Sequence, residues 1–430
     1  MIAKARPLSA RTLISCVAIL SMIPTLVLAF DAGTKPPAGK LVVHEWGTFT
    51  NFSGSDGVNL DFRPLTTNDL PRFVMTPYNQ PGSLARIFAK ATFVARQRME
   101  TPVTYFYTDQ PRTVKVRVDF PQGMLTDWYP VVKSSQSGAA PDSPTITGGS
   151  FLNWGDVRLT PPKQFADIRV IGPKQLPVPA SLPPVSASNH YGRARETDSA
   201  IVETVDVDRG SHFEKFLFYR GVGNFALPLK LVALGSDRFE INNSGDEATG
   251  SLLLMHINEG LVRFTRIDPI RAHSLVEVTL PENETTVDQL SEAMVQELNA
   301  TGLYEKESLA MVNTWRPNWF GENGTRLLYM VPQSQTDKLL PLKIEPKPDE
   351  QLRVLVGRLE TITPEDCQQL VLRLVGDANN PTTEQRTKNE LTALGRFAEP
   401  AIKFAINQTK DQTIRNQLTK VLVTLHPNEH

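Results

Sequence analysis

The stretch Glu100–Val131 restricts the possible folds of this chain more than any other. Within it, the segment Thr113–Phe120 alternates between apolar and polar residues without a break. Its apolar positions are Val114, Val116, Val118 and Phe120. This period of two is typical of a half-buried β-strand. Turn-forming residues separate the segment from Val103–Thr108 and from Met124–Pro130, so we predict a three-stranded meander that serves as the framework of a β-sheet domain.

Short runs rich in β-branched and aromatic residues continue on both sides of this stretch, as expected for strands. The further predicted strands are Leu41–Thr50, Phe151–Thr160, Ala200–Val207, Phe213–Tyr219, Pro228–Leu234, Phe239–Asn243, Ser251–Ile257, Leu261–Ile267, Leu275–Leu280, Arg326–Val331 and Leu352–Leu359. Such a density of short strands favours a mainly β fold, an antiparallel sandwich or a barrel-like arrangement, over alternating βαβ units.

A few helices are expected within this β-rich domain. The apolar spacing from Leu84 to about Arg98 is helical. Thr286 and Gln289 have the spacing of a capping box, and Gly302 can end the helix that follows them. A shorter helix is predicted over Glu305–Asn313.

The sequence pattern changes at Thr363, where Thr-Pro-Glu-Asp forms a helix start with a cap residue and proline at the first position. Further helices are predicted at Thr383–Leu394, Ala398–Asn407 and Gln412–Leu425. We therefore expect a β-rich main domain over residues 30–360 and a small all-α domain over residues 361–430. Cys367 lies on an apolar helical stripe, which favours a buried, unreactive thiol.

Residues 1–29 have the pattern of a signal peptide. Lys4, Arg6 and Arg11 precede an apolar run, and Val27-Leu28-Ala29 is a small-x-small cleavage site. An uncleaved membrane anchor is the alternative, since the apolar run is close to the shortest length that spans a bilayer. The sequence predicts export to the periplasm or the extracellular space, with no membrane attachment after cleavage.

The composition of the remaining chain excludes several classes of protein. Three of its 45 basic residues lie in the leader, which leaves 42 against 46 acidic residues and a net charge of −4. That balance gives no electrostatic basis for binding nucleic acid. Cys367 is the one cysteine left after cleavage, so neither an internal disulfide nor a cysteine-based zinc site is possible, and no cofactor is predicted.

Four segments resemble a group of large secreted bacterial proteins without an assigned activity. They are Val43-His44-Glu45-Trp46-Gly47-Thr48-Phe49-Thr50, the stretch from Glu100 to Pro130, Asn313–Phe320 and Arg353–Arg358. The resemblance implies secretion and says nothing about chemistry. Separately, Leu391–Ile402 is similar to one helical unit of HEAT-like repeats, which implies a surface for a protein partner.

The sequence contains no strong catalytic motif, since it lacks a Gly-x-Ser-x-Gly elbow, a His-Glu-x-x-His pair and a phosphate-binding glycine loop. Weaker candidates remain beside structural explanations. Two of the carboxylates Glu45, Glu100 and Asp127 could flank a glycosidic bond, or all three could be caps and surface groups. The aromatic candidates for stacking on a glycan are Trp46, Trp128, Tyr129 and Trp154, with core packing as the alternative. His44, His190 and His212 could ligate a metal, or could be hydrogen-bonded structural histidines.

We conclude from the sequence that the chain is an exported cell-envelope protein. It is interpreted first as a binding or structural β-sandwich module whose helical tail contacts a protein partner. A secreted hydrolase acting on polysaccharide is the second hypothesis, and a metal-dependent hydrolase is the third.

Overall fold

The computed structural model describes residues 38–65, 69–77, 92–140, 143–171, 176–208, 210–375 and 381–425. The predicted signal peptide therefore lies outside the described residues. So does most of the helix predicted from Leu84, and its last two residues, Gln97 and Arg98, instead begin a strand.

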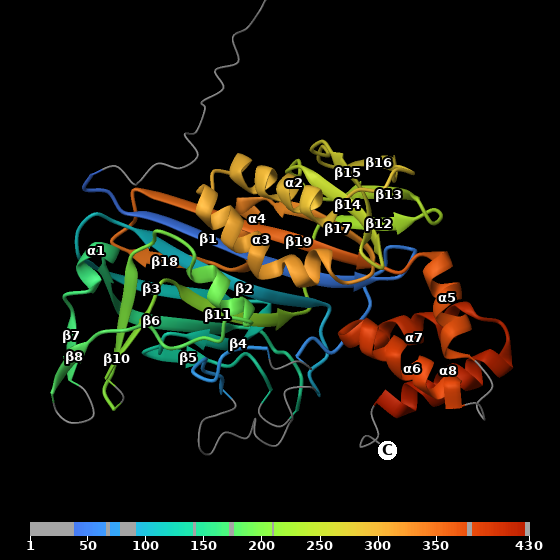
Figure 1. Cartoon of the computed structure of the whole chain (residues 1–430), viewed down its shortest axis with the longest axis horizontal. Helices are drawn as coiled ribbons and strands as arrows, with labels where there is room; N and C mark the ends of the chain where they lie inside the picture. The colour runs from blue at the N-terminus through green and yellow to red at the C-terminus, as the bar shows by residue number, and fades with distance from the viewer. Residues whose placement is uncertain are drawn as a thin grey trace, which may run out of the picture. The chain divides into compact units, whose positions relative to one another are not determined.

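The largest sheet among the described residues has eight strands, and we call it the main sheet (Figure 1). Its strands are, in spatial order, β15 Leu261–Ile267, β14 Leu252–Asn258, β17 Gly324–Val331, β19 Glu350–Thr361, β1 Val42–Ser53, β2 Gln97–Tyr107, β11 Leu217–Gly223 and β4 Gly123–Tyr129. Neighbouring strands run antiparallel except β1 and β19, which pair in parallel although some 300 residues separate them along the chain. The mainly β prediction is confirmed.

A second sheet packs against one face of the main sheet. Its strands are β10 Gly210–Glu214, β9 Ile201–Asp206, β6 Ser150–Thr160, β3 Arg112–Phe120 and β18 Leu342–Glu345, with β5 Ser134–Gln136 beside β6. Smaller sheets are formed by β12 Leu229–Ala233, β13 Arg238–Asn243 and β16 Ser274–Thr279, and by β7 Arg169–Ile171 with β8 Pro177–Pro179. Side chains from the facing sheets form one apolar core, in which Val114, Val116 and Val118 of β3 meet Val43 and Phe49 of β1.

The three predicted strands of Glu100–Val131 exist, but they do not form a meander. β2 and β4 lie in the main sheet and are separated there by β11, whereas β3 lies in the second sheet between β6 and β18. The alternation in β3 correctly identifies its apolar face. It cannot identify the neighbouring strand, because each turn carries the chain across the core instead of folding it back in a hairpin.

Helices cover the other face of the main sheet, as Figure 1 shows for α2 and α3 over β1 and β19. The segments on this face are the 3-10 turn η4 His190–Arg195, α2 Val287–Ala300 and α3 Glu305–Phe320. Two shorter helices, α1 Pro162–Phe165 and α4 Gln333–Leu339, lie elsewhere. The capping box of Thr286 and Gln289 is present at the start of α2. Arg326 donates hydrogen bonds to carbonyls at the end of α3, those of Asn318 and Trp319 among them, and so satisfies groups that a helix end leaves unpaired.

The C-terminal part is helical from Pro364 onward, as predicted. It contains α5 Pro364–Leu374, α6 Pro381–Leu394, the 3-10 turn η5 Gly395–Phe397, α7 Ala398–Gln408 and α8 Gln412–Leu425, together called the tail helices. Phe52 at the end of β1 packs with Phe397, their ring centroids 4.9 Å apart, in an apolar cluster that also contains Ile402 and Leu418. The division into two domains stays a prediction.

Candidate functional site

Glu45 is buried on the face of β1 that points toward the second sheet. Its carboxylate lies 2.6 Å from Arg353 Nη2 and accepts hydrogen bonds from Arg353 Nε, Tyr219 and Thr104. Both partners of the ion pair are fully buried. Glu45 therefore joins β1 to β19, β2 and β11, and has no access to a polysaccharide.

His44 points to the opposite face of β1, as adjacent strand residues must. Its Nδ1 lies 2.7 Å from Glu307 Oε2 under α3, and its ring contacts those of Tyr304 and Tyr107. Both His44 and Glu307 are fully buried. The pair holds α3 against the sheet.

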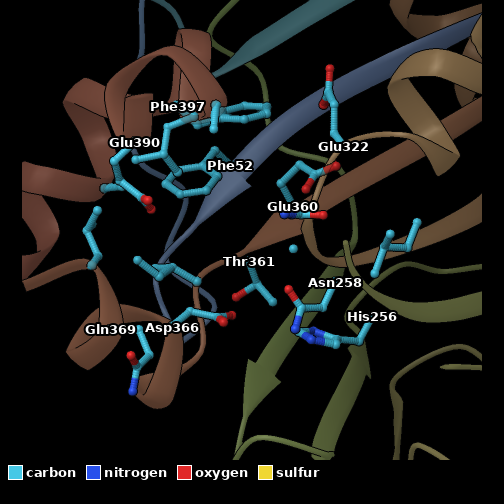
Figure 2. Close-up of a pocket in the computed structure, with 18 of the residues that line it drawn as sticks. Phe52, His256, Asn258, Glu322, Glu360, Thr361, Asp366, Gln369, Glu390 and Phe397 are labelled. Atoms are coloured by element: carbon cyan, nitrogen blue, oxygen red, sulfur yellow. The ribbon is translucent and has the colours of Figure 1, made fainter. Parts of the chain in front are cut away.

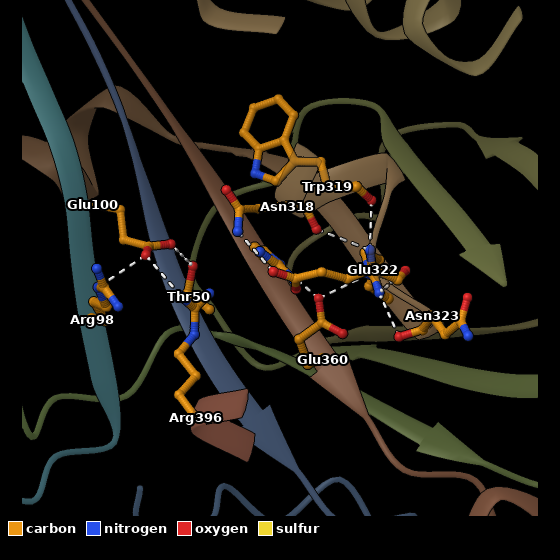
Figure 3. Close-up of polar contacts among 11 residues, drawn as sticks. Thr50, Arg98, Glu100, Asn318, Trp319, Glu322, Asn323, Glu360 and Arg396 are labelled. Carbon is orange, nitrogen blue, oxygen red and sulfur yellow. Dashed lines mark hydrogen bonds and ion pairs between the residues drawn. The ribbon is translucent and has the colours of Figure 1, made fainter. Parts of the chain in front are cut away.

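Glu100 lies on the same face as His44, so it and Glu45 project from opposite sides of the main sheet. Figure 3 shows its carboxylate among Thr50, Arg98 and Arg396. Burial by itself raises the pKa of Glu100, but the guanidiniums of Arg396 and Arg98, first among several, outweigh this and lower the pKa to about 2. Two carboxylates separated by a sheet cannot flank one glycosidic bond.

Asp127 lies opposite Arg220 in the pairing of β4 with β11 and accepts a hydrogen bond from Thr126. The aromatic candidates are core residues as well. Trp46, Trp128, Tyr129 and Trp154 each expose at most 4% of their surface. The prediction that they form a platform for glycan stacking is therefore wrong, because a platform must face solvent.

The three histidine candidates are not brought together as metal ligands. His190 begins η4, with its Nε2 3.8 Å from Asp69 and its ring 5.9 Å from that of Trp315. His212 in β10 lies beside Tyr129. Within the described ranges, no three His, Cys, Asp or Glu side chains are grouped so that they could hold a metal ion.

A cleft of ≈ 260 Å³ lies between the end of the main sheet and the tail helices. Figure 2 shows Phe52 and Phe397 on one side of it and His256 and Asn258 on the other. Its apolar lining residues include Ile362, Leu370, Leu394 and Ala401, and its acidic ones are Glu322, Glu360, Asp366 and Glu390. The walls thus combine apolar and acidic surface within one opening.

Buried arginines hold the carboxylates at the sheet side of the cleft. Arg358 donates from Nη2 to Glu322 (2.5 Å) and from Nε to Glu360 (2.6 Å), and Arg326 Nε lies 2.9 Å from Glu360. Burial by itself raises the pKa of Glu322, but the Arg358 and Arg396 guanidiniums lower it to about 2. The Glu322 carboxylate therefore stays ionised at neutral pH and cannot act as a general acid, and Arg358 compensates its charge.

The tail side of the cleft is less constrained. Glu390 on α6 pairs with Arg373 on α5, at 3.2 Å.

On the sheet side of the cleft, His256 Nδ1 lies 2.9 Å from the Thr325 hydroxyl. Burial lowers the pKa of His256, and Asp366 opposes that shift. The imidazole is therefore mainly neutral near pH 7 and can donate or accept one hydrogen bond from Nε2.

Sequence reasoning missed this cleft because its lining comes from distant parts of the chain. Phe52 ends β1, His256 belongs to β14, Glu322 follows α3 and Phe397 lies in the tail. The resemblance of Leu391–Ile402 to a HEAT-like unit was the one signal that pointed to the tail as a binding surface.

A scan against models of protein families finds no match, and neither does a search of curated proteins. Among solved structures, the chain is similar to a yeast delta-COP-I mu-homology domain complexed with a Dsl1 WxWxV peptide. The identity is 7%, the match covers 76% of this chain and 97% of that chain, and the TM-score is 0.25. A TM-score this low carries no argument. Among the described residues, no helix is both long and apolar enough to cross a bilayer.

Proposed function

We propose that this chain is an exported binding protein of the cell envelope, and that a segment of a partner protein binds in the cleft between the main sheet and the tail helices. The observation that carries the proposal is the mixed lining of this cleft. Phe52, Phe397 and Leu394 supply apolar surface, while Asp366 and Glu390, the latter paired with the lining residue Arg373, supply acidic groups. A peptide with an apolar side chain next to a lysine or arginine matches both features.

The side chains first suspected of catalysis support a binding role over hydrolysis. Glu45 and Glu100 are buried in ion pairs on opposite faces of the sheet. Trp46 and Trp128 lie in the cores on either side of it. These groups stabilise the framework and are out of reach of a ligand, whereas the cleft offers a ligand both polar and apolar side chains.

The test is selection from a random peptide library on the full mature chain, followed by affinity measurements on the selected peptides. We expect those peptides to combine an apolar residue with a neighbouring Lys or Arg. Ala393 lines the cleft from an exposed position on α6, so Ala393→Trp fills the opening without disturbing a core. This variant is expected to weaken binding at least tenfold.

The matched control is Leu372→Trp on α5, at a position that is 63% exposed and does not line the cleft. It should bind like the unmodified chain. The proposal fails if the library yields no binders, or if Ala393→Trp and Leu372→Trp bind the selected peptides equally well.

A further inference from the structure

Three buried arginines project from the face of the main sheet that carries the helices. They are Arg220 of β11, Arg98 of β2 and Arg358 of β19, each at most 2% exposed. In the strand register, Val222 of β11 lies opposite Arg98, and Thr50 of β1 lies between Arg98 and Arg358. The three arginines therefore form a band of positive charge that runs across β11, β2, β1 and β19.

Asp69 binds at the Arg98–Arg220 end of this band. Its two oxygens accept hydrogen bonds from Arg220 Nη1 (2.7 Å) and Nη2 (3.3 Å), and its Oδ2 lies 3.8 Å from Arg98 Nη2. His190 Nε2 is also 3.8 Å from Asp69. The Asp69 side chain is 33% exposed, so it separates the two buried guanidiniums from solvent.

The donors at this end outnumber the acceptors. Arg98 Nη1, Arg220 Nε and His190 Nε2 are buried and make no hydrogen bond with any described residue. A buried donor without a partner costs about 1–3 kcal/mol, and more when it carries charge. Most such groups in native proteins bind protein, water or a ligand, so the buried N–H groups of Arg98 and Arg220 need an acceptor, and His190 Nε2 can donate to the same acceptor in the tautomer that carries its proton.

The electrostatics place several positive groups close together. Burial lowers the pKa of Arg98, its partner Glu100 raises it, and the neighbouring guanidiniums of Arg220 and Arg396 lower it again, to about 10. Burial and the nearby Arg220 also lower the pKa of His190. Burial by itself also lowers the pKa of Arg220, but Asp69, Asp127 and Glu100 outweigh this and raise it, so the charge of Arg220 is compensated whereas Arg98 and His190 are disfavoured in their charged forms.

We propose that Arg98, Arg220 and His190 form a binding site for a small oxyanion group, a carboxylate or a phosphate, and that Asp69 occupies this site in the absence of ligand. Paired guanidiniums match the planar, two-oxygen geometry of such groups. Asp69 presents a carboxylate to them in the geometry that a ligand would use, and its partial exposure allows a ligand to displace it. None of these residues lines the cleft, so the site is independent of the proposed peptide binding.

The test measures binding of inorganic phosphate and of acetate by calorimetry, at constant ionic strength, to the mature chain and to Asp69→Asn. Removing the internal carboxylate is expected to strengthen binding of the preferred anion at least tenfold. Arg220→Met in the Asp69→Asn background should abolish it. The anion that binds more tightly identifies the ligand group as a phosphate or a carboxylate.

Asp337→Asn is the matched control, because Asp337 is also partly exposed and paired with a buried arginine, Arg353, which keeps Glu45 as a second partner. Asp337→Asn should bind both anions with the same affinity as the unmodified chain. That result would show that the tighter binding of Asp69→Asn is specific to its site and is not a general effect of phosphate on the protein. The proposal is overturned if neither anion binds, or if Arg220→Met leaves binding intact. Should Asp69→Asn fail to fold, the same anions are titrated into the unmodified chain and into Arg220→Lys. We expect Arg220→Lys to bind the preferred anion tenfold more weakly. The proposal is refuted if the unmodified chain shows no saturable binding of either anion.

Discussion

Replacing Glu45 by glutamine tests whether the buried ion pair with Arg353 holds the first and last strands of the main sheet together. One carboxylate oxygen of Glu45 accepts from Arg353, and the other accepts from Tyr219 and Thr104. Glutamine has the same shape but one acceptor oxygen. It must turn its NH₂ group toward either the guanidinium or the two hydroxyl groups, so some donors lose their acceptor.

The expected cost follows from what Arg353 retains. Removing one partner of a buried ion pair typically costs about 3–5 kcal/mol, because a charge is left uncompensated. Arg353 still donates to Asp337 (2.8 Å) and to the Leu340 carbonyl (2.7 Å). We therefore expect Glu45→Gln to lower the free energy of unfolding by about 3 kcal/mol, measured by urea denaturation with circular dichroism.

Two further variants make this prediction strict. Glu196→Gln removes a carboxylate whose pair with Arg193 is about half exposed on both sides, and should cost at most about 1 kcal/mol. Glu45→Met/Arg353→Met removes both buried charges and should be more stable than Glu45→Met alone. The reasoning is refuted if Glu45→Gln lowers the free energy of unfolding no more than Glu196→Gln does. It is also refuted if Glu45→Met/Arg353→Met is less stable than Glu45→Met.

Three other predictions follow from buried groups elsewhere in the fold. Glu100 has a pKa of about 2 against an ordinary 4.5, so its ionised form stabilises the fold fully above pH 4.5 and this contribution is lost as the pH falls toward 2. Urea titrations should show that the free energy of unfolding falls by an amount on the order of 3 kcal/mol over that pH range, and that Glu100→Gln lacks this fall. Equal dependence of the unfolding free energy on pH in the two proteins would contradict the prediction. Gly357→Ala should lower the free energy of unfolding by at least about 1–3 kcal/mol, since an added Cβ would lie 2.0 Å from a ring carbon of Tyr329. Its control is Gly235→Ala, where the added Cβ would have no atom within 4 Å, and the same assay should find that variant as stable as the unmodified chain. Burial raises the pKa of the Cys367 thiol, so its alkylation by iodoacetamide at pH 8 should be far slower in the folded chain than in urea, and equal rates would place the thiol at the surface.

Local sequence patterns predicted the elements of this fold better than their arrangement. The predicted strand Phe213–Tyr219 shows the difference. Its residues divide between β10 in the second sheet and β11 in the main sheet, so one apolar run serves two layers. Nothing in a run of β-branched and aromatic residues marks where the chain crosses from one sheet to another.

The site residues show a similar limit. His44 and Glu45 face opposite ways, which follows from strand geometry alone. The partners Glu307 and Arg353 lie more than 260 residues away along the chain and were not predictable. Charged residues in a strand were interpreted as surface groups or catalysts because their burial depends on a distant residue of opposite charge.

The sequence by itself determined the mainly β character, the positions of most strands, the capping box before α2 and the change to helices at Thr363. These depend on residues within a few positions of one another, where periodicity, turn residues and caps act. Only the tertiary structure decided that β3 leaves its neighbours for the second sheet and that β1 pairs in parallel with β19. It also decided that arginines and carboxylates meet beneath α3 and the tail. Such pairings depend on burial and charge compensation between distant segments, which local sequence does not encode.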